Sequence, residues 1–511
     1  MKTMMLLRFQ IVIASAVAAG CLAGCRVGPK YQRPPAIAQA PPTTYKESPQ
    51  NFPGSDAWKV AQPQDAMLRG KWWEIFNDPE LNSLEEKVNV DNQNIKRAFE
   101  NFMAARAVVA EARSQLFPAV GFNPSFTESG SSRNSSSTAS SSSVIPTNRV
   151  SGLYSLPVDV SWEPDFFGRI RNTIREQQYA AQVTAADLEN ERLIEQASLA
   201  QFLFQIRGQD ALLALLNQTI SDYEKTLEYT RAQYETGIGT QISVVEAQGN
   251  LQSAQAAATN VGVARSQYEH AIAVLIGANP STFSIPTQPL NAVPPAVPLG
   301  LPSQLLERRP DIAAAERTMA QANAAIGVAD AAFYPTVTLG GSVGLSSSSL
   351  KHLFDWSSRV WSVGPNVSET IYDGGLRRAT VREFVATYNA DVANYRQAVL
   401  TAFQQVEDYL ASVRILSQEI QQQEQAVASA QQFVDLELAR YQTGIDPYVN
   451  VLTAQNTLLG DRQTLTNLRT QAMTSSVQLI VALGGGWDSS QLPTPEQVSQ
   501  TPPASQTAIQ R

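Results

Sequence analysis

The sequence predicts a membrane α+β fold in which four strands per chain enter a shared β-barrel, and long helices continue that barrel as a coiled-coil tube. Three observations predict this class: an internal duplication, two very long polar helical segments, and four short alternating segments between helices. The duplication is seen in Tyr234 and Tyr441, since 441 − 234 = 207. The same shift relates four further pairs: Gly168/Gly375, Val244/Val451, Gln248/Gln455 and Gly277/Gly484. A fixed offset kept over such a distance means that each half is one structural unit.

The two longest helical patterns begin near residues 169 and 376, and each continues for roughly 67 residues. At about 1.5 Å per residue, such a helix spans on the order of 100 Å. That length exceeds an ordinary globular core, so the helix needs a partner along its whole course. We therefore expect a coiled coil or a helical tube.

The composition excludes several classes of function. Charged residues make up 16% of the chain, against about 25% in typical soluble proteins. Without Lys2 and Arg8, which lie in the predicted signal segment, 36 basic residues face 46 acidic ones, a balance of −10. We therefore expect no nucleic-acid partner, because phosphate binding needs clustered Lys and Arg. Only Cys21 and Cys25 are present, which leaves no disulfide framework and no thiolate metal site.

Residues 1–24 have the pattern of a secretory signal, with a basic start, a short apolar run and small residues after it. The run Leu22-Ala23-Gly24-Cys25 resembles the bacterial lipobox, which implies cleavage before Cys25 and acylation of its thiol and new amino terminus. Several acyl chains on one residue would anchor the protein firmly. The alternative is ordinary cleavage with an unmodified thiol, and Cys21 should leave with the signal in either case.

Residues 25–34, CRVGPKYQRP, closely resemble the amino-terminal signature of lipoproteins in the TolC-like (or OprM-like) outer membrane factor family. Residues 71–81, KWWEIFNDPEL, are similar to that family as well, and we expect their two tryptophans to form an apolar clamp at a helix start. The resemblance implies an exit duct of a tripartite efflux pump, located in the bacterial outer membrane and extending into the periplasm. Residues up to 70 are rich in Pro, Gln, Ser and Thr, which predicts an extended strap with little packing of its own.

A shorter helix should open each half, over residues 80–116 and 311–333. The two segments match at a shift of about 217, and each ends before an aromatic–proline pair, Phe117-Pro118 or Tyr334-Pro335. The residue before a proline is pushed out of the helical region, so the helices should stop there.

Four segments then alternate apolar with small or polar residues, and we expect each of them to be a strand: 120–127, 154–163, 336–345 and 361–368. Alternation at every second residue, with one apolar face and one polar face, is typical of a transmembrane barrel strand. About ten tilted residues suffice to cross a bilayer core. Serine-rich loops at 128–149 and 345–359 should lie outside the cell.

Four strands cannot close a barrel, and lipid does not tolerate an open sheet edge. At least two chains must therefore share one barrel, because the smallest known barrels have about eight strands. Two chains would give about eight strands and three chains about twelve, and the residues alone leave both open. The family resemblance implies a homotrimer with about twelve strands.

The remaining segments complete the domain organisation. Return helices are expected over 240–276 and 447–483, the second with an apolar residue at every seventh position from Val451 to Leu479. We divide the chain into a signal peptide (1–24), a lipidated strap (25–78), a first repeat (79–279), a proline-rich crossing (280–309), a second repeat (310–484) and a C-terminal tail (485–511). The tail should be disordered from residue 493 onward.

We expect no enzyme, cofactor or metal site. His270 and His352 are the only histidines, and neither has a second histidine at metal-ligand spacing. The run from Gly340 to Gly344 faintly resembles a phosphate loop, but it lacks the following lysine and helix.

Gly237 and Gly444 each follow a tyrosine by three residues at the end of a long helix, which predicts a glycine C-cap at each tip. The resemblance implies that the tips lie at the periplasmic end, close the tube and meet a periplasmic adaptor (membrane fusion) protein. The tip residues that this contact would use are Tyr234, Gly237, Ile238, Tyr441, Gly444, Ile445 and Asp446.

The two copies differ where a gate could be built, since Thr226 becomes Phe433 and Thr230 becomes Glu437 in the second half. The resembled family has an apolar and an acidic ring near this tip, which implies a periplasmic gate at Phe433 and Glu437. Several carboxylates converging on an axis would attract cations and repel anions. The alternative is a solvated Glu beside a Phe in the helix seam.

The resemblance implies a passive duct for drugs or other small toxic solutes, energised through the adaptor by an inner membrane pump of the RND type. Outer membrane lipids would be the other partner. Two alternatives stay open: the exit duct of a type I protein secretion system, and a structural coiled-coil lipoprotein that conducts nothing. The exported substrates cannot be read from the sequence.

Overall fold

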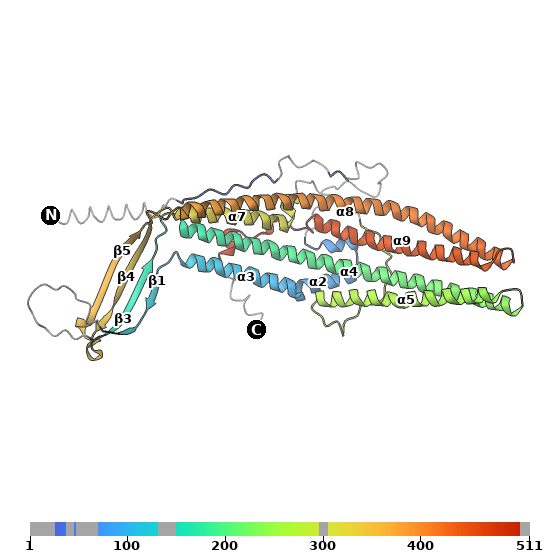
Figure 1. Ribbon diagram of the computed structural model, residues 1–511, viewed down its shortest axis with the longest axis horizontal. Helices are drawn as coiled ribbons and strands as arrows, with labels where there is room; N and C mark the ends of the chain where they lie inside the picture. The colour runs from blue at the N-terminus through green and yellow to red at the C-terminus, as the bar shows by residue number, and fades with distance from the viewer. Residues whose placement is uncertain (1–25, 37–44, 48–69, 131–149, 296–304, 501–511) are drawn as a thin grey trace, which may run out of the picture.

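The protein is elongated, with a β-sheet at one end and a body of long helices at the other (Figure 1). The computed structural model describes residues 26–36, 45–47, 70–130, 150–295 and 305–500. The predicted signal peptide and Cys25 lie outside the described residues, as does most of the first serine-rich loop. No helix among the described residues combines the length and the apolarity that a membrane span needs.

The sheet is antiparallel throughout and is four strands wide, because two short strands share one edge position. Strands β3 (Val150–Trp162) and β4 (Thr336–Ser347) pair at its centre, with Val158 opposite Val343. Strand β5 (Arg359–Ser368) pairs with β4, while β1 (Ala119–Phe122) and β2 (Ser125–Gly130) both pair with β3. The sequence predicts a single first strand over residues 120–127, and the structure has two short strands there, which pair with successive parts of β3. The break falls between Phe122 and Ser125 because Pro124 has no N–H to donate to the ladder.

The two edges of this sheet are unpaired within the described part of the chain: β1 and β2 bond only to β3, and β5 only to β4. Apolar side chains along these edge strands are exposed, among them Phe122, Phe126, Trp361, Val363 and Val367. A sheet with two open edges and exposed apolar side chains needs both strand partners and an apolar solvent.

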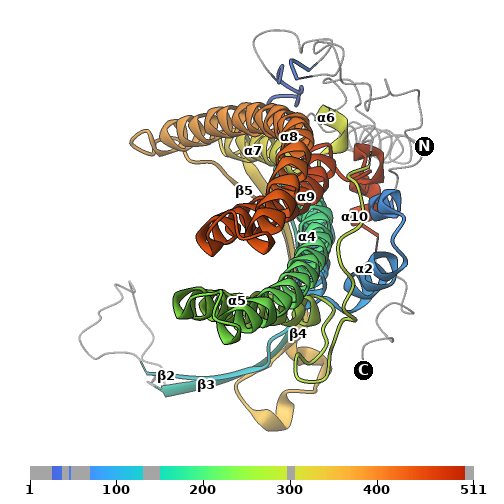
Figure 2. The same ribbon diagram turned by 90° about the vertical axis from the view of Figure 1, so that its right-hand side faces the viewer.

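The helical body repeats one pattern twice. Helices α4 (Arg169–Glu235) and α8 (Leu376–Gln442) have 67 residues each, and α5 (Gln241–Leu275) and α9 (Tyr448–Ala482) have 35 each, which confirms the internal duplication. Both long helices start from a glycine in the left-handed region, Gly168 with φ 81° and Gly375 with φ 94°. Viewed from the end, the helices form an open arc rather than a closed bundle (Figure 2).

The sequence predicts one continuous opening helix over residues 80–116 in the first repeat, but the structure has two helices there. They are α2 (Pro79–Asp91) and α3 (Gln93–Ser114), separated by Asn92 in an extended conformation. The Asn92 side chain accepts hydrogen bonds from the first amides of α3 and donates to the carbonyl of Leu275, so it caps the new helix. The equivalent position in the second repeat, Arg309, separates α6 (Leu305–Arg308) from α7 (Pro310–Ala331).

The strap and the tail are packed more than their composition predicts. In the strap, Tyr31 donates a hydrogen bond to Glu316 of α7 and Tyr45 is buried. The expectation of disorder from residue 493 is wrong for the described part of the tail, because residues Pro495–Val498 form helix α10. Val498 is buried against α3 and α4, and the composition of the tail does not predict this contact.

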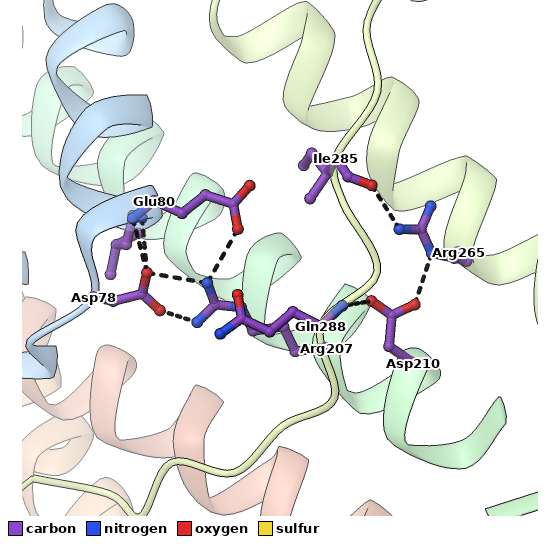
Figure 3. A network of polar contacts seen from close by, with 8 residues as sticks. Asp78, Glu80, Arg207, Asp210, Arg265, Ile285 and Gln288 are labelled. Atoms are coloured by element: carbon purple, nitrogen blue, oxygen red, sulfur yellow. Dashed lines mark hydrogen bonds and ion pairs between the residues drawn. The ribbon is translucent and has the colours of Figure 1, made fainter. Parts of the chain in front are cut away.

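The main core lies around the middle of the helical body. The short 3-10 helix η3 (Trp72–Phe76) buries both of its tryptophans there, as expected of an apolar clamp, and they pack with residues of α4 and α9 such as Phe204 and Ile480. Beside this core, Arg207 of α4 contacts the carboxylates of Asp78 and Glu80 at the start of α2 (Figure 3).

The same polar network fixes the crossing between the repeats. Asp210 accepts a hydrogen bond from Arg265 of α5 at 2.7 Å and another from the backbone N–H of Gln288 at 2.9 Å (Figure 3). Arg265 also donates to the carbonyl of Ile285. Burial lowers the pKa of Arg207 from its ordinary value, and the charge of Asp210 opposes this effect.

Candidate gate at the helix tips

Both tip turns are built in the same way. Gly237 and Gly444 adopt left-handed φ values of 77° and 72° just after the long helices end. The amide of the next residue, Ile238 or Ile445, donates back to the carbonyl five residues earlier, at 3.0 and 2.9 Å respectively. Together with the glycine amides bonded to Tyr234 and Tyr441, this is a Schellman motif, which satisfies the last carbonyls of each helix.

The tips expose apolar side chains. A Schellman motif usually packs its residue after the glycine on an apolar residue of the last helical turn. Here that turn offers Gln233 and Arg440 instead, so Ile238 is 78% and Ile445 65% exposed. The turns therefore present one isoleucine each beyond the ends of the long helices.

The two copies of the tip tyrosine have different surroundings. Tyr234 is about half exposed, whereas Tyr441 is buried between Tyr448 of α9 and Tyr229 of α4, with ring centroids 5.4 and 5.9 Å away. The Tyr229 hydroxyl donates to the carbonyl of Gln442 at 3.4 Å. We call Tyr229, Tyr441 and Tyr448 the tyrosine latch, because it joins α4 of the first repeat to the α8–α9 turn of the second. Burial and the neighbouring Tyr229 raise the pKa of Tyr441.

Behind the latch, the two helical hairpins are separated by a cavity of about 500 Å³, whose walls include Tyr223 and Tyr229 on α4 and Val434 and Leu438 on α8. The latch is one part of a wider contact between the hairpins, because Leu227 of α4 and Ala247 of α5 share an apolar cluster with Tyr441, Tyr448 and Val451 of the second repeat. Its Tyr229 and Tyr448 were not identified from the sequence. The duplicate of Tyr229 is Leu436, so comparing the repeats gives no signal for it.

The two candidate gate residues lie one turn apart on α8. Phe433 is 40% exposed and Glu437 is half-buried. Their first-repeat counterparts, Thr226 and Thr230, are buried, and Thr226 accepts a hydrogen bond from Gln455 of α9. The difference arises because α4 packs against both α5 and α9, which covers this face of α4.

Charged side chains surround Glu437 at the tip. Arg440 forms an ion pair with Asp446 across the turn, and the hydrogen bond from Arg440 lowers the pKa of Asp446. The bond to Asp446 and, more weakly, the charge of Glu437 raise the pKa of Arg440. One carboxylate oxygen of Glu437 is buried and accepts no hydrogen bond within the described residues. A group from outside the chain or a water would have to satisfy it.

The other chemistry-bearing residues stay apart. His270 is exposed on α5, and the His352 ring lies beside Asp355 of its own loop, with Nδ1 2.8 Å from the carboxylate. Within the described ranges, no three His, Cys, Asp or Glu side chains gather in a way that could hold a metal ion.

Comparison with known proteins identifies similar chains over nearly the whole length. The sequence profile of the family described as outer membrane efflux protein matches residues 86–278 and 301–485. The probable efflux pump outer membrane protein TtgC of Pseudomonas putida is 32% identical over 481 residues, which cover 93% of this chain and 96% of TtgC. The outer membrane protein OprJ of Pseudomonas aeruginosa is 31% identical over 487 residues, with the same coverage. The solved outer-membrane channel OprN superposes with a TM-score of 0.80 at 26% identity, covering 91% of this chain and 100% of OprN.

Proposed function

Since the chain belongs to the outer membrane efflux protein family and is an outer membrane exit channel, we propose that it works as a homotrimer joined to a periplasmic adaptor and an inner membrane pump of the RND type. The observation that supports a barrel shared between copies is the sheet, which is four strands wide and has two open edges. In lipid each unpaired backbone group costs several kcal/mol, so β5 of one copy must find the β1–β2 edge of the next. Three copies give about twelve strands, enough for an open lumen.

The tips support the proposed contact with the adaptor. Ile238 and Ile445 are exposed without apolar neighbours in their own turns, and each is held in place by a Schellman motif. Two rigid apolar side chains per copy suit docking onto a protein partner. Tyr234, half exposed beside Ile238, and Asp446, held by Arg440, complete this surface.

The gate is proposed at Phe433 and Glu437. Phe433 is 40% exposed among the described residues, and a threefold axis beside α8 would bring three phenylalanines and three carboxylates together. A ring of three carboxylates would favour cations, and a ring of three phenylalanines would narrow the path. The cargo of this duct would be drugs or other small toxic solutes, selected by the inner membrane pump.

Conductance in planar lipid bilayers tests the proposed function. A trimeric duct should give discrete single-channel steps, whereas a structural coiled-coil lipoprotein should give none. The other alternative is the exit duct of a type I secretion system. Cells that express the chain with its pump should then export a polypeptide, and removing the chain should leave sensitivity to small toxic solutes unchanged.

Lipidation at Cys25 is proposed from the lipobox, and it has its own test. Metabolic labelling with a fatty acid should mark the protein, and Cys25→Ser should abolish the label. Cys21→Ser is the matched control, because Cys21 belongs to the predicted signal and its loss should leave labelling intact. Undiminished labelling of the Cys25→Ser protein would remove this site from the proposal.

A further inference from the structure

A second cavity, of about 330 Å³, lies where the strap crosses α4 and α7. Its walls come from all three segments: Arg26, Lys30 and Tyr31 of the strap, Arg175 and Tyr179 of α4, and Asn323 of α7. Neither the proposed gate nor the tip turns use any of these residues. The Tyr31 and Tyr179 rings, with centroids 6.3 Å apart, form an aromatic wall.

The charge of this cavity is one-sided. Among the described residues, three cationic side chains line it and no carboxylate does. None of the three cations forms an ion pair or side-chain hydrogen bond within the described part of the chain. The neighbouring carboxylate of Glu316 already accepts a hydrogen bond from Tyr31 at 2.5 Å and lies 2.7 Å from the Arg317 guanidinium. The cavity therefore offers three cationic side chains to an anionic group.

A buried polar group opens into the same cavity. Asn323 is only 7% exposed, and its side-chain amide has no hydrogen bond within the described residues. Because Asn323 lines the cavity, a ligand there can reach this amide. Its N–H groups can donate to an oxygen that also meets the three cations.

The position of the cavity points to a ligand from the membrane. The strap is tied to the junction of strand and helix, because the Val27 amide donates to the carbonyl of Phe167 at 3.2 Å. Arg175 lies six residues after the start of α4 at Arg169, roughly 9 Å along the helix axis. The polar headgroup region on each side of a bilayer is about 5–8 Å thick. Since the strands are the membrane-spanning part, the cavity lies near headgroup depth on the periplasmic side.

We propose that this cavity binds the phosphate group of a phospholipid from the periplasmic leaflet of the outer membrane. Lys30 and the two arginines would neutralise the phosphate through charge-assisted hydrogen bonds, and Asn323 would donate to one of its oxygens. The glycerol backbone would lie against the tyrosine wall, with the acyl chains toward the bilayer. Arg26 directly follows Cys25, so the lipid would lie beside the proposed acyl anchor. The inference depends on the membrane orientation of the chain and not on conduction, so a channel that conducts normally could still lack this site.

The test is lipid binding by the full chain in detergent, with dioctanoyl phosphatidylglycerol as the probe and native mass spectrometry as the readout. The variant carries Lys30→Ala and Arg175→Ala, two exposed positions, and leaves Arg26 next to Cys25 unchanged. Removing two charge-assisted contacts should raise the Kd by at least about tenfold. Arg175→Lys keeps the positive charge and should retain most of the lipid binding. Retained binding would show that a substitution at this position leaves the fold intact.

The matched control is Arg382→Ala. Arg382 is the duplicate of Arg175 in the second repeat and is exposed, but Ala386 replaces Tyr179 there, so the aromatic wall is missing. Its loss should leave the Kd unchanged. Equal lipid binding by the double variant and the unmodified protein would overturn the proposal. Equal weakening by Arg382→Ala would also overturn it, because general surface charge would then suffice. Displacement of the probe by inorganic phosphate at equal concentration would show a site for a soluble anion instead of a lipid.

Discussion

Replacing Tyr229 with leucine should release the tip of α8 from α4 and open the channel more often. The substitution removes the edge-on contact with the Tyr441 ring, whose plane lies at 74° to that of Tyr229, and the hydroxyl's 3.4 Å bond to Gln442. Other contacts between the hairpins remain, among them Leu227 in the apolar cluster around Val451 and the hydrogen bond from Gln455 to Thr226, so the variant should keep its fold. Tyr229 is half-buried, so leucine fits its place without exposing the main core.

The size of the effect follows from the two lost contacts. An aromatic pair contributes about 0.5–1.5 kcal/mol beyond its buried area, and a hydrogen bond this long contributes about 0.5 kcal/mol at most. The latched tip should therefore lose about 0.5–2 kcal/mol per chain, which changes the ratio of open to closed states by about two- to thirtyfold for each latch that opens.

The assay is single-channel recording in planar bilayers, with open probability as the readout. Tyr229→Phe keeps the ring and should change the ratio by less than about threefold. Of the two hydrogen bonds it removes, only the long one to Gln442 joins α4 to α8, because the other comes from Gln233 of α4 itself. Tyr234→Leu is the matched control, because Tyr234 is the exposed duplicate of Tyr441 and contacts no other ring within the described residues. If Tyr229→Leu opened no more often than the unmodified channel, the latch would have no part in closing the tip.

Three further predictions concern charge. Glu437→Gln should lower the cation-to-anion permeability ratio, measured from reversal potentials in a salt gradient, and an unaltered ratio would argue against an acidic ring. Arg207→Ala leaves the buried carboxylate of Asp78 unpaired and should cost about 3–5 kcal/mol in the free energy of unfolding; denaturant titration would refute this with a loss below about 1 kcal/mol. The hydrogen bond from Arg377 and two backbone amides lower the pKa of Asp373 from 3.8 to about 2, so its stabilising effect is complete above the unfolded value and lost as pH falls from about 4 to about 2. The Tm of Asp373→Asn should fall less across that window than the Tm of the unmodified protein, and equal slopes would contradict the assignment.

Much of the architecture could be predicted because it depends on local rules. The shift that relates Tyr234 to Tyr441 gave two long helices of equal length, and the glycines at the tips gave two Schellman turns. Alternation of apolar and polar residues gave the sheet. The tip glycines and the alternation lie within a few residues of the features they predict, and the duplication is visible by comparing the two halves of the sequence.

The features that sequence reasoning missed depend on distant partners. The break at Asn92 needs the carbonyl of Leu275, and Val498 of α10 needs a buried site on α3 and α4. The residues next to Asn92 or Val498 in the sequence do not identify these distant partners. The sequence also contained the change from Thr226 to Phe433, but only the packing of α4 on α9 shows why one is buried and the other exposed.

The central claim is that one chain holds too few strands to close a barrel, so copies must pool them. Native mass spectrometry of the purified protein in detergent tests this claim most directly. The account predicts a complex with the mass of three chains that reverts to one chain only on unfolding. A folded particle with the mass of a single chain, stable without detergent, would contradict it.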